Sequence, residues 1–593
     1  MTAAKRPLII ANCSGFFGDH PLAAERLLAG PDPFDVLTGD YLAELTMLIL
    51  WKQRRRDPEA GYVGTFADQM AGVLATALGR GIRIVVNAGG LNPRGLRDRL
   101  HSIAADAGLK VSIAIVEGDD LSGRLDELAA AGVELRNLDT GEPLGERRDQ
   151  VATANAYLGA FGIARALDAG ADIVLTGRVT DAALVTGPAA WWHGWGPSDL
   201  DPLAASVVVG HVLECGTQAT GGNYPFRDEI TPGFPGYPMA EIAADGTSVI
   251  TKQHGSPGAV TIGTVTAQLL YELAGPRYEN PDVAARFDTI ELSDLGPDRV
   301  GISGVRGEAP SGDLKVALNL EGGYRNAVGV VLTGLDIEAK AAEVTSLLLS
   351  ELGGAEQFDE LDVRLIRTDQ PNSPTNEGAT ATLKISVKST DADLVGRRFS
   401  NAAVALTLAS IPGFVTTAPP GPASAFGIYL PALVPGELVD HIVELDDGTR
   451  LDIAPPPRSP ITSLDIEPQG IAPRSDENEA TVLIPLGRLV GARSGDKGGN
   501  ANVGFWARSP EVWAWMHAEL DVELLTTLLP EAAGLEIRRF ELANLEALNF
   551  VIIGLLDEGV AATARPDPQA KGLGEYLRSR FVEVTTSLAE QFK

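Results

Sequence analysis

Residues 490–507, VGARSGDKGGNANVGFWA, place two cations and a carboxylate among glycines, between two apolar runs. Glycines let backbone N–H groups converge on an anion, and two basic side chains add charge where a phosphate or carboxylate could sit. The alternative is a structural turn with an internal salt network, which is worth little if it is exposed. We favour an anion clamp, and its predicted members are Arg493, Ser494, Asp496, Lys497 and Asn500.

Residues 210–226, GHVLECGTQATGGNYPF, hold a second group of reactive side chains. His211 and Glu214, three positions apart, could share a proton or act as acid and base on a carbonyl substrate. The alternatives are buried polar packing and a metal site, but the metal site lacks a third ligand within local reach, so no metal is expected. Cys215 could be a nucleophile, yet free cysteines are usually buried and inert. Candidate substrate-binding residues in this segment are Gln218, Gly221 and Gly222.

Residues 13–21, CSGFFGDHP, occupy the turn after the first predicted strand, a favoured position for a site in an α/β sheet. Ser14 lacks the G-x-S-x-G context of a nucleophile and has no evident base. We therefore expect Ser14 and Asp19 to position an anion or substrate, and we count Asp19 among the catalytic candidates. Helix N-capping is the alternative and the more common role for such residues.

Residues 87–96, NAGGLNPRGL, follow a predicted strand and open a predicted helix. Free N–H groups at the helix start, together with a nearby arginine, could hold a phosphate or carboxylate. The segment matches neither G-x-G-x-x-G nor G-x-x-x-x-G-K-[ST], so neither NAD nor ATP is indicated. The alternative is a tight turn, and the candidate binding residues are Asn87, Gly89, Gly90 and Arg94.

Residues 175–184, LTGRVTDAAL, follow a further predicted strand. Arg178 and Asp181 are three positions apart, so on a helix they share one face and an Arg–Asp pair is the structural interpretation. The functional interpretation is an arginine fork that binds a carboxylate of the substrate. Both residues remain substrate-binding candidates.

The elements that must position these residues fall into distinct regions. Continuous apolar strands alternate with helices over 1–255, which predicts an α/β domain with a mostly parallel, doubly wound sheet. Residues 256–455 predict an α+β region of the same core, and a proline-rich, then acidic stretch predicts a linker at 456–482. The strand and helix order over 483–593 predicts a small ferredoxin-like α+β domain. In open α/β sheets, functional residues gather at the carboxyl ends of the strands.

Composition excludes several classes of function. The chain has 593 residues and a formal net charge of −31, so nucleic acid and anionic membrane surfaces are not expected as partners. Its two cysteines exclude a disulfide scaffold and a cysteine-rich zinc site. The N-terminal apolar run is too short for a signal peptide, and no run approaches a membrane span. We therefore expect a cytoplasmic protein.

Taken together and in this order, these segments resemble the acyclic terpene utilisation protein family, AtuA. The segments that carry the resemblance are SGFFGD, GDYLAELTM, NAGGLNPRGL, TGRVTDAALV, ECGTQATGGN, QLLYE and GISGVRGEAPSGDLKV. ARSGDKGGNANVGFWAR looks like the signature of the family's C-terminal ferredoxin-fold domain. One segment departs from the family pattern: TKQHGSPGAV has Ser256 and Pro257 where threonine and glycine are expected. That departure puts in question whether the loop binds the same group as in relatives.

The resemblance implies a role in the breakdown of citronellol- and geraniol-type acids through branched acyl-CoA thioesters. The expected function is therefore an acyl-CoA-processing enzyme, a lyase or hydratase acting on a branched 3-hydroxyacyl-CoA. Glu214 and His211 would transfer protons, while Arg178, Asn87 and Gln218 would orient the acyl group. No cofactor is expected beyond the coenzyme A of the substrate.

Two alternatives remain open at this point. One is a non-catalytic acyl-CoA-binding or assembly subunit of such a pathway. The other is a hydrolase of a phosphate compound, for which Asp19 and His20 give only a thin basis. The length of the chain and its several apolar helices predict a homo-oligomer.

Overall fold

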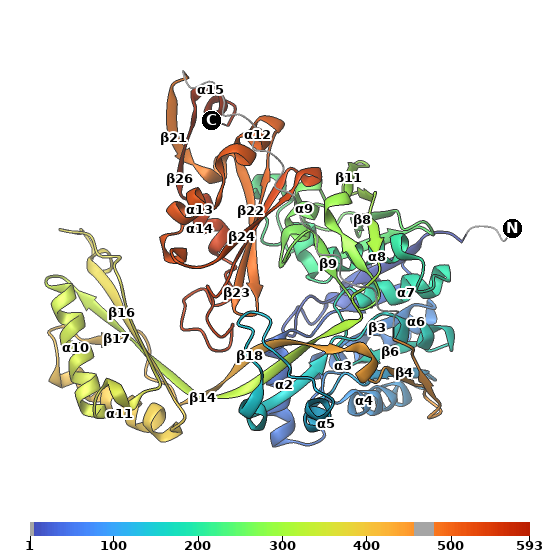
Figure 1. Ribbon diagram of the computed structural model, residues 1–593, viewed down its shortest axis with the longest axis horizontal. Coiled ribbons are helices and arrows are strands. Elements are labelled where there is room, and N and C mark those ends of the chain that lie inside the picture. The colour runs from blue at the N-terminus through green and yellow to red at the C-terminus, as the bar shows by residue number, and fades with distance from the viewer. Residues whose placement is uncertain (1–4, 456–478, 593) are drawn as a thin grey trace. The chain divides into compact units, whose positions relative to one another are not determined.

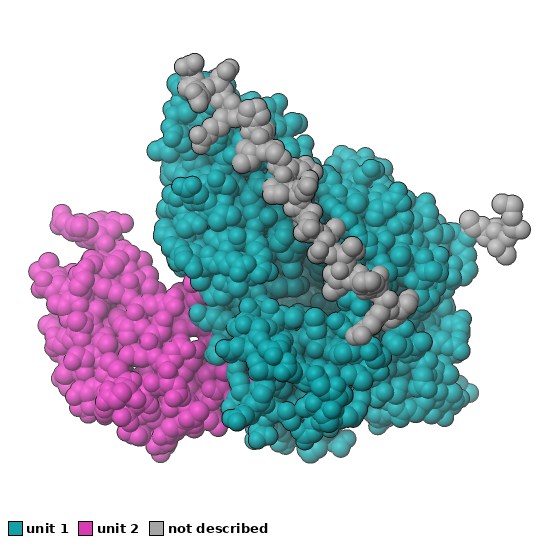
Figure 2. All heavy atoms as spheres, in the orientation of Figure 1, with its two compact units in different colours: residues 1–319, 429–560, 567–593 teal, residues 320–428, 561–566 magenta. Residues whose placement is uncertain are grey.

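The computed structural model describes residues 5–455 and 479–592. The chain divides into two compact units, coloured separately in Figure 2. Unit 1 comprises Met1–Asn319, Tyr429–Val560 and Asp567–Lys593, and unit 2 comprises Leu320–Ile428 and Ala561–Pro566. The predicted middle region, 256–455, thus contributes to both units. Most of the predicted linker at 456–482 lies outside the described residues.

Unit 1 contains an eleven-stranded sheet in the order β11-β12-β8-β7-β1-β2-β3-β6-β4-β19-β20. Figure 1 labels β11, β8, β3, β6 and β4 of this sheet. The five central strands are parallel: β1 (Leu8–Asn12), β2 (Val36–Gly39), β3 (Arg83–Val86), β6 (Ile173–Thr176) and β4 (Ile113–Glu117). Antiparallel strands extend one edge: β7 (Pro238–Ile242), β8 (Ser248–Lys252), β12 (Val300–Ser303) and β11 (Glu291–Asp294). Two more extend the other edge: β19 (Ile442–Glu444) and β20 (Arg450–Asp452).

The prediction of a mostly parallel, doubly wound sheet is not confirmed, because this sheet is mixed. The difference arises at the edges, where β7 and β8, β11 and β12, and β19 and β20 form antiparallel pairs. Short connections can join antiparallel strands, whereas parallel strands need a long crossover. An apolar run in the sequence predicts a buried strand, but it does not show whether that strand runs parallel or antiparallel to its neighbour.

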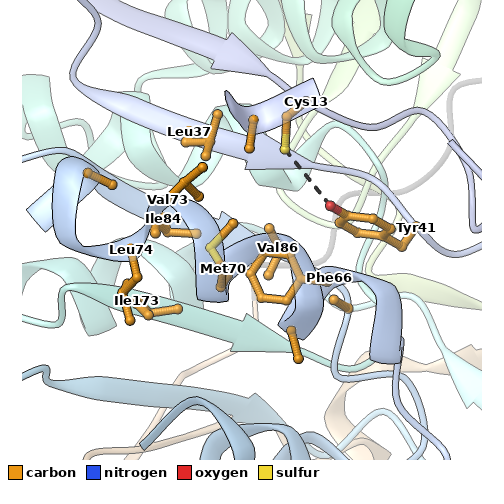
Figure 3. Packing of buried hydrophobic residues seen from close by; sticks show 14 of the residues in the cluster. Cys13, Leu37, Tyr41, Phe66, Met70, Val73, Leu74, Ile84, Val86 and Ile173 are labelled. Atoms are coloured by element: carbon orange, nitrogen blue, oxygen red, sulfur yellow. Dashed lines mark hydrogen bonds between the residues drawn. The ribbon is translucent and has the colours of Figure 1, made fainter. Parts of the chain in front are cut away.

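Helices pack on the central strands through alternating side chains. Leu37, Ile84 and Val86 lie in one buried core with α1 (Ala23–Ala29), α3 (Gly64–Gly79) and α4 (Pro93–Asp106), part of which Figure 3 shows. Val36 and Val85 alternate with them, are equally buried, and therefore point to the opposite face. The helix α7 (Ala183–His193) contacts β1, β2 and β3, and α8 (Leu200–Leu213) contacts β7 and β8.

Unit 2 is built on the antiparallel strands β15 (Glu360–Ile366), β16 (Thr380–Ser389) and β14 (Asp313–Thr333). The helix α10 (Ile337–Leu352) buries Val344, Leu348 and Leu352, spaced on one helical face, in the same core as α11 (Phe399–Ala409). The strand β14 begins in unit 1, and β18 (Ser424–Pro435) returns the chain from unit 2 to unit 1. The short strand β17 (Val415–Thr416) also pairs with β14.

The C-terminal part of unit 1 is a small ferredoxin-like α+β domain, as predicted. Its antiparallel sheet has the order β22 (Val490–Lys497), β23 (Asn500–Ala507), β25 (Ala547–Ile552), β24 (Ile537–Leu542). Its other elements are β21 (Thr481–Pro485), α12 (Pro510–Glu519), α13 (Val522–Leu528), α14 (Leu573–Arg578), β26 (Phe581–Thr585) and α15 (Thr586–Glu590). Ser509 begins α12 by accepting a hydrogen bond from the backbone of Val512, with proline at the first helical position.

Unit 1 has further helices and strands. They are α2 (Glu44–Arg56), α5 (Leu125–Ala130), β5 (Val151–Ala156), α6 (Phe161–Asp168), α9 (Ile262–Leu270), β9 (Arg277–Glu279), β10 (Ala284–Arg286) and β13 (Arg306–Glu308). Of these, β13, β10 and β9 form a small antiparallel sheet of their own. Across residues 5–455 and 479–592, no helix combines the length and the apolar character that a membrane span requires.

Candidate functional site

Polar side chains lie together where the central parallel strands of unit 1 end. Asp40 follows β2 and accepts a 2.6 Å hydrogen bond from Nδ2 of Asn87, which follows β3. Asp119 follows β4 and accepts a 2.7 Å hydrogen bond from the backbone N–H of Arg178, which follows β6. Burial raises the pKa of Asp119 to about 7. The hydrogen bonds thus link the four strand ends in two neighbouring pairs.

Arg178 is the buried cation of this group. Its guanidinium donates a 2.5 Å hydrogen bond to the carbonyl of Leu42 and lies 3.2 Å from Oδ1 of Asp181. It also lies 4.2 Å from the ring centroid of Tyr157, as a cation–π contact requires. The predicted Arg178–Asp181 contact is therefore present. The guanidinium also packs on the ring of Tyr157, a contact that the three-residue spacing in the sequence did not predict.

Glu44, the first residue of α2, lies on the more exposed side of the group. It accepts a 3.1 Å hydrogen bond from Tyr157 and lies 3.7 Å from Nζ of Lys315, and the side chains of Glu44 and Lys315 are each 30% exposed. Desolvation works to raise the pKa of Glu44, but the charges of Lys315 and Arg178 outweigh it and lower the pKa to about 2. This ion pair is open to solvent.

His211 and Glu214 form a buried pair at the end of α8. Nδ1 of His211 lies 3.2 Å from Oε1 of Glu214, while Oε2 of Glu214 has no hydrogen-bond partner among the described residues. Burial lowers the pKa of His211 to about 4, and the charge of Lys497 acts in the same direction. Burial raises the pKa of Glu214 well above its ordinary value, and the carboxylates of Asp181 and Glu272 add to the shift. Both shifts favour the uncharged forms, a neutral imidazole beside a carboxyl group that holds its proton to a higher pH than usual.

The segment predicted as a glycine-rich loop is a β-hairpin. Arg493, Asp496 and Lys497 lie on β22, which pairs with β23 so that Lys497 faces Asn500 across a two-residue turn. Gly498 has φ +66°, a conformation that such a turn demands and that glycine adopts without strain. The glycines serve the hairpin, and the strand sends alternate side chains to opposite faces.

The hairpin brings two cations to the group. Nζ of Lys497 lies 5.7 Å from the ring centroid of Tyr278, and that ring lies 5.3 Å from the ring of His211. Arg493 donates a hydrogen bond to Oε1 of Gln218 and lies 4.5 Å from the ring of Tyr271. His211, Glu214, Gln218, Arg493 and Lys497, which come from distant segments, are therefore neighbours in unit 1.

Asp496 on β22 and Lys571 lie near Tyr271, the ring that Arg493 also contacts. Nζ of Lys571 donates a 3.1 Å hydrogen bond to Oη of Tyr271. Burial raises the pKa of Asp496 to about 8, the carboxylates of Glu272 and Glu44 add to the shift, and Lys571 opposes it. Burial, reinforced by neighbouring carboxylates, thus raises the pKa of several carboxyl groups here above its ordinary value.

Asp19 and Ser14 hold the loop that follows β1. Asp19 accepts hydrogen bonds from the backbone of Gly15 (2.8 Å) and His20 (2.6 Å) and from the hydroxyl of Tyr237 (2.5 Å). Ser14 donates to the carbonyl of Phe16. These contacts engage both oxygens of Asp19, so its geometry is that of a loop-stabilising carboxylate.

Several other predicted residues also have structural partners. Arg94 makes surface ion pairs with Glu117 and Glu444, and Ser494 bonds the backbone of Ala570 and Gly574. The side-chain amide of Asn500 donates a hydrogen bond to Asp139, and that of Asn87 donates one to Asp40.

The predicted glycines permit close backbone packing, since a Cβ atom at any of them would lie within 3.0 Å of another residue. These glycines are Gly89, Gly90, Gly221 and Gly222.

Sequence reasoning missed Asp40, Glu44, Tyr157, Lys315 and Tyr278 as members of the group. Lys315 comes from β14 and Tyr278 from β9, and no local spacing connects either to the strand ends. Asp40 and Glu44 lie in GDYLAELTM, and Lys315 lies in GISGVRGEAPSGDLKV, both of which carried the family resemblance. The family resemblance could therefore have pointed to Asp40, Glu44 and Lys315, but it gave no indication of Tyr157 or Tyr278.

The residues named above form what we call the strand-end cluster: Asp40, Glu44, Tyr157, Arg178, Asp181, His211, Glu214, Tyr278, Lys315 and Lys497. It combines carboxyl groups of raised pKa, an imidazole of lowered pKa and three cations, and such groups can transfer a proton beside a developing negative charge. Within the described ranges, no group of three or more His, Cys, Asp or Glu side chains is arranged to hold a metal ion.

Comparison with protein families agrees with the two parts of the chain. Residues 8–445 match the model of the acyclic terpene utilisation family protein AtuA, and residues 484–583 match that of the AtuA ferredoxin-like domain. No curated protein and no solved structure matches the chain. The resemblance seen in the sequence is confirmed: the chain belongs to the acyclic terpene utilisation family AtuA.

Proposed function

We propose that the protein is an acyl-CoA-processing enzyme of the hydratase or lyase type, acting in the catabolism of branched or terpenoid acids. The observation that supports this most is the buried His211–Glu214 pair with the ammonium of Lys497 near its aromatic neighbour Tyr278. The family description supplies the terpenoid context. The homo-oligomer and the cytoplasmic location stay predictions.

The proposed hydratase step needs one group that gives and retakes a proton. Protonated Glu214 donates its proton to the leaving 3-hydroxyl, the C–O bond breaks, and water departs. In the same concerted step the resulting carboxylate removes a proton from the α-carbon, so negative charge develops on the thioester oxygen as the electron pair of the C–H bond forms the C=C bond of an enoyl thioester. Glu214 is again protonated at the end, so the products are the enoyl thioester and one water molecule. Neutral His211 packs against Glu214, with Nδ1 3.2 Å from Oε1, and limits the positions that the carboxyl group can take.

Removal of the α-proton places negative charge on the thioester oxygen. Lys497 and Arg178 are the cations available to stabilise it, and in a site shielded from water each such interaction is strong. The coenzyme A is part of the substrate, and the proposal requires no other cofactor.

The test incubates the full chain with a panel of branched 3-hydroxyacyl-CoA and enoyl-CoA thioesters and follows each by mass spectrometry. We expect gain or loss of one water, or cleavage into two carbonyl fragments if the enzyme is a lyase. Glu214→Gln should lack turnover yet still bind thioesters, while the control Glu25→Gln, an exposed glutamate on α1, should behave as wild type. Binding without any mass change in the wild type would instead favour a non-catalytic acyl-CoA-binding subunit.

A further inference from the structure

Within unit 1, an open pocket lies where residues 226 and 228 meet the ferredoxin-like domain, and none of its lining residues belongs to the strand-end cluster. Its volume is about 360 Å³, and its lining includes Phe226, Asp228, Arg488, Arg508, Glu575 and Arg578. Three arginines around one pocket are notable in a chain whose net charge is −31. The size lies at the lower end of the range of roughly 300–1,000 Å³ that is typical of small-molecule sites. We call it the arginine pocket.

An aromatic ring fixes two of the three guanidinium groups. Phe226 is 8% exposed, and the guanidinium carbons of Arg508 and Arg578 lie 4.3 Å and 4.9 Å from its ring centroid. Arg578 also donates to the backbone carbonyls of Val490 (3.2 Å) and Gly487 (3.1 Å). These contacts hold two like charges against one ring, so the site is organised before any ligand arrives.

The carboxylates nearby leave hydrogen-bond donors unused. Glu575 accepts a 2.6 Å hydrogen bond from Arg578, and Glu229 lies 3.5 Å from a terminal nitrogen of Arg508. A third carboxylate, that of Asp228, also lines the pocket. Arg488 is exposed and, among the described residues, has no carboxylate partner. Arg488 and most of the guanidinium of Arg508 therefore remain available to an anion.

The arginine pocket and the strand-end cluster are built on the same two chain segments. Phe226 lies twelve positions after Glu214 and closes residues 210–226, the stretch that also carries Gln218. Arg488 lies just before β22, the strand that carries Arg493 and Lys497. A single extended ligand that filled the arginine pocket and reached the strand-end cluster would therefore contact each of these two segments at two points.

We propose that the arginine pocket binds the phosphate groups at the nucleotide end of the coenzyme A thioester, an inference that rests on the proposed function. Planar guanidinium groups bind phosphate oxygens in a bidentate way, which suits doubly charged phosphates better than a single carboxylate. The role expected of Arg493 and Lys497 changes accordingly. Arg493 is engaged by Gln218 and Tyr271, and Lys497 faces the proton-transfer pair, so both serve the acyl end.

The first test measures binding to the full chain by calorimetry with three probes: coenzyme A, adenosine 3′,5′-bisphosphate and inorganic phosphate. Arg488→Ala/Arg508→Ala should bind the first two probes at least about tenfold more weakly. The control is Arg136→Ala/Arg538→Ala, which removes two exposed arginines that pair with neighbouring glutamates. Equal binding by the variant and the wild type overturns the proposal. Binding of inorganic phosphate alone, with no gain from the nucleotide, also overturns it.

Because Arg508 packs on Phe226, the double variant could lose the local fold. The single variant Arg488→Gln changes an exposed side chain only, and it should still weaken nucleotide binding and reduce its salt dependence. Unchanged affinity and an unchanged salt slope in a folded Arg488→Gln protein overturn the proposal.

A second readout separates this proposal from the proposed function. Acyl-pantetheine thioesters lack the nucleotide, so the double variant should process them as the wild type does while its kcat/KM for acyl-CoA falls. If no thioester reacts but coenzyme A binding is lost in the variant, the arginine pocket stands and the proposed reaction fails. If thioesters react and the variant keeps its full kcat/KM for acyl-CoA, the reaction stands and the pocket fails.

Discussion

Nδ1 of His211 lies 3.2 Å from Oε1 of Glu214, and the two side chains are 1% and 6% exposed. At this depth the charged form of either group is costly, so burial raises the pKa of Glu214 and lowers the pKa of His211. The shifts move in opposite directions because one group is an acid and the other a base. Burial thus favours the neutral form of both groups, and the carboxyl group of Glu214 then has a proton to transfer.

The rate should depend on pH through this pair. Because Glu214 must begin protonated, kcat/KM should stay level across neutral pH and fall only as the pH rises through the elevated pKa of Glu214. The acid limb should lie near the lowered pKa of His211, about 4. A pH–rate profile of the wild type measures both limbs. A basic limb at the ordinary pKa of glutamate would contradict the assignment of Glu214 as the acid.

Lys497→Met should lower kcat/KM by roughly 10²-fold, since it removes a cation that stabilises the thioester oxygen. The change should also move the pH profile, because Lys497 lowers the pKa of both Glu214 and His211. Without it both pKa values rise, so both limbs should shift to higher pH. The control Lys110→Met, at an exposed lysine, should alter neither rate nor profile. A lower rate with unmoved limbs would mean that Lys497 acts only through folding.

Local spacing predicted contacts within one helix or turn and little beyond them. His211 and Glu214, and Arg178 and Asp181, are three positions apart, and the structure places each pair 3.2 Å apart. Tyr278 reaches His211 from β9, a strand of three residues that no periodicity reveals. Such contacts depend on the tertiary fold, which a single sequence specifies only through its packing.

The β-hairpin formed by β22 and β23 shows that glycine content alone does not predict what a glycine-rich segment does. The glycines of residues 490–507 predicted an anion-binding loop, but Gly498 supplies the positive φ of a two-residue turn. Gly495 and Gly504 allow close approach, because a Cβ atom there would meet Tyr271 and Leu270 at 2.3 Å and 2.6 Å. Glycine is required by tight turns, by close packing and by anion loops alike, so composition could not separate these roles.

Gly177→Ala should destabilise the fold at the end of β6. A Cβ atom there would lie 2.4 Å from Oδ1 of Asp119. This carboxylate is held in place because its other oxygen, Oδ2, accepts hydrogen bonds from the backbone N–H of Arg178 (2.7 Å) and from Nδ2 of Asn155 (2.9 Å). We expect a loss of roughly 1–3 kcal/mol in the free energy of unfolding. The control is Gly72→Ala, because nothing lies within 4 Å of a Cβ atom at this position inside α3. That change should stabilise by about 0.5–1 kcal/mol. Thermal melts of both variants measure the contrast, and equal shifts would refute the steric argument.

Asp282→Asn should change how stability depends on pH. Oδ2 of Asp282 accepts a 2.7 Å hydrogen bond from the backbone N–H of Ala160, at the start of α6, and burial raises the pKa of this carboxyl group from 3.8 to about 6. Between these values the folded protein retains the proton and the unfolded chain has lost it. The wild type therefore loses stability as the pH rises from about 4 to about 6.

The asparagine keeps an oxygen for Ala160 and cannot ionise, so the variant escapes that loss. Relative to the wild type it should gain on the order of 1–3 kcal/mol above pH 6 and gain nothing below about pH 4. Melting temperatures of both proteins across this window measure the difference. The control Asp126→Asn changes a side chain that is 93% exposed and should give a difference independent of pH. A pH-independent difference for Asp282→Asn as well would mean that the carboxyl group is already ionised in the folded protein.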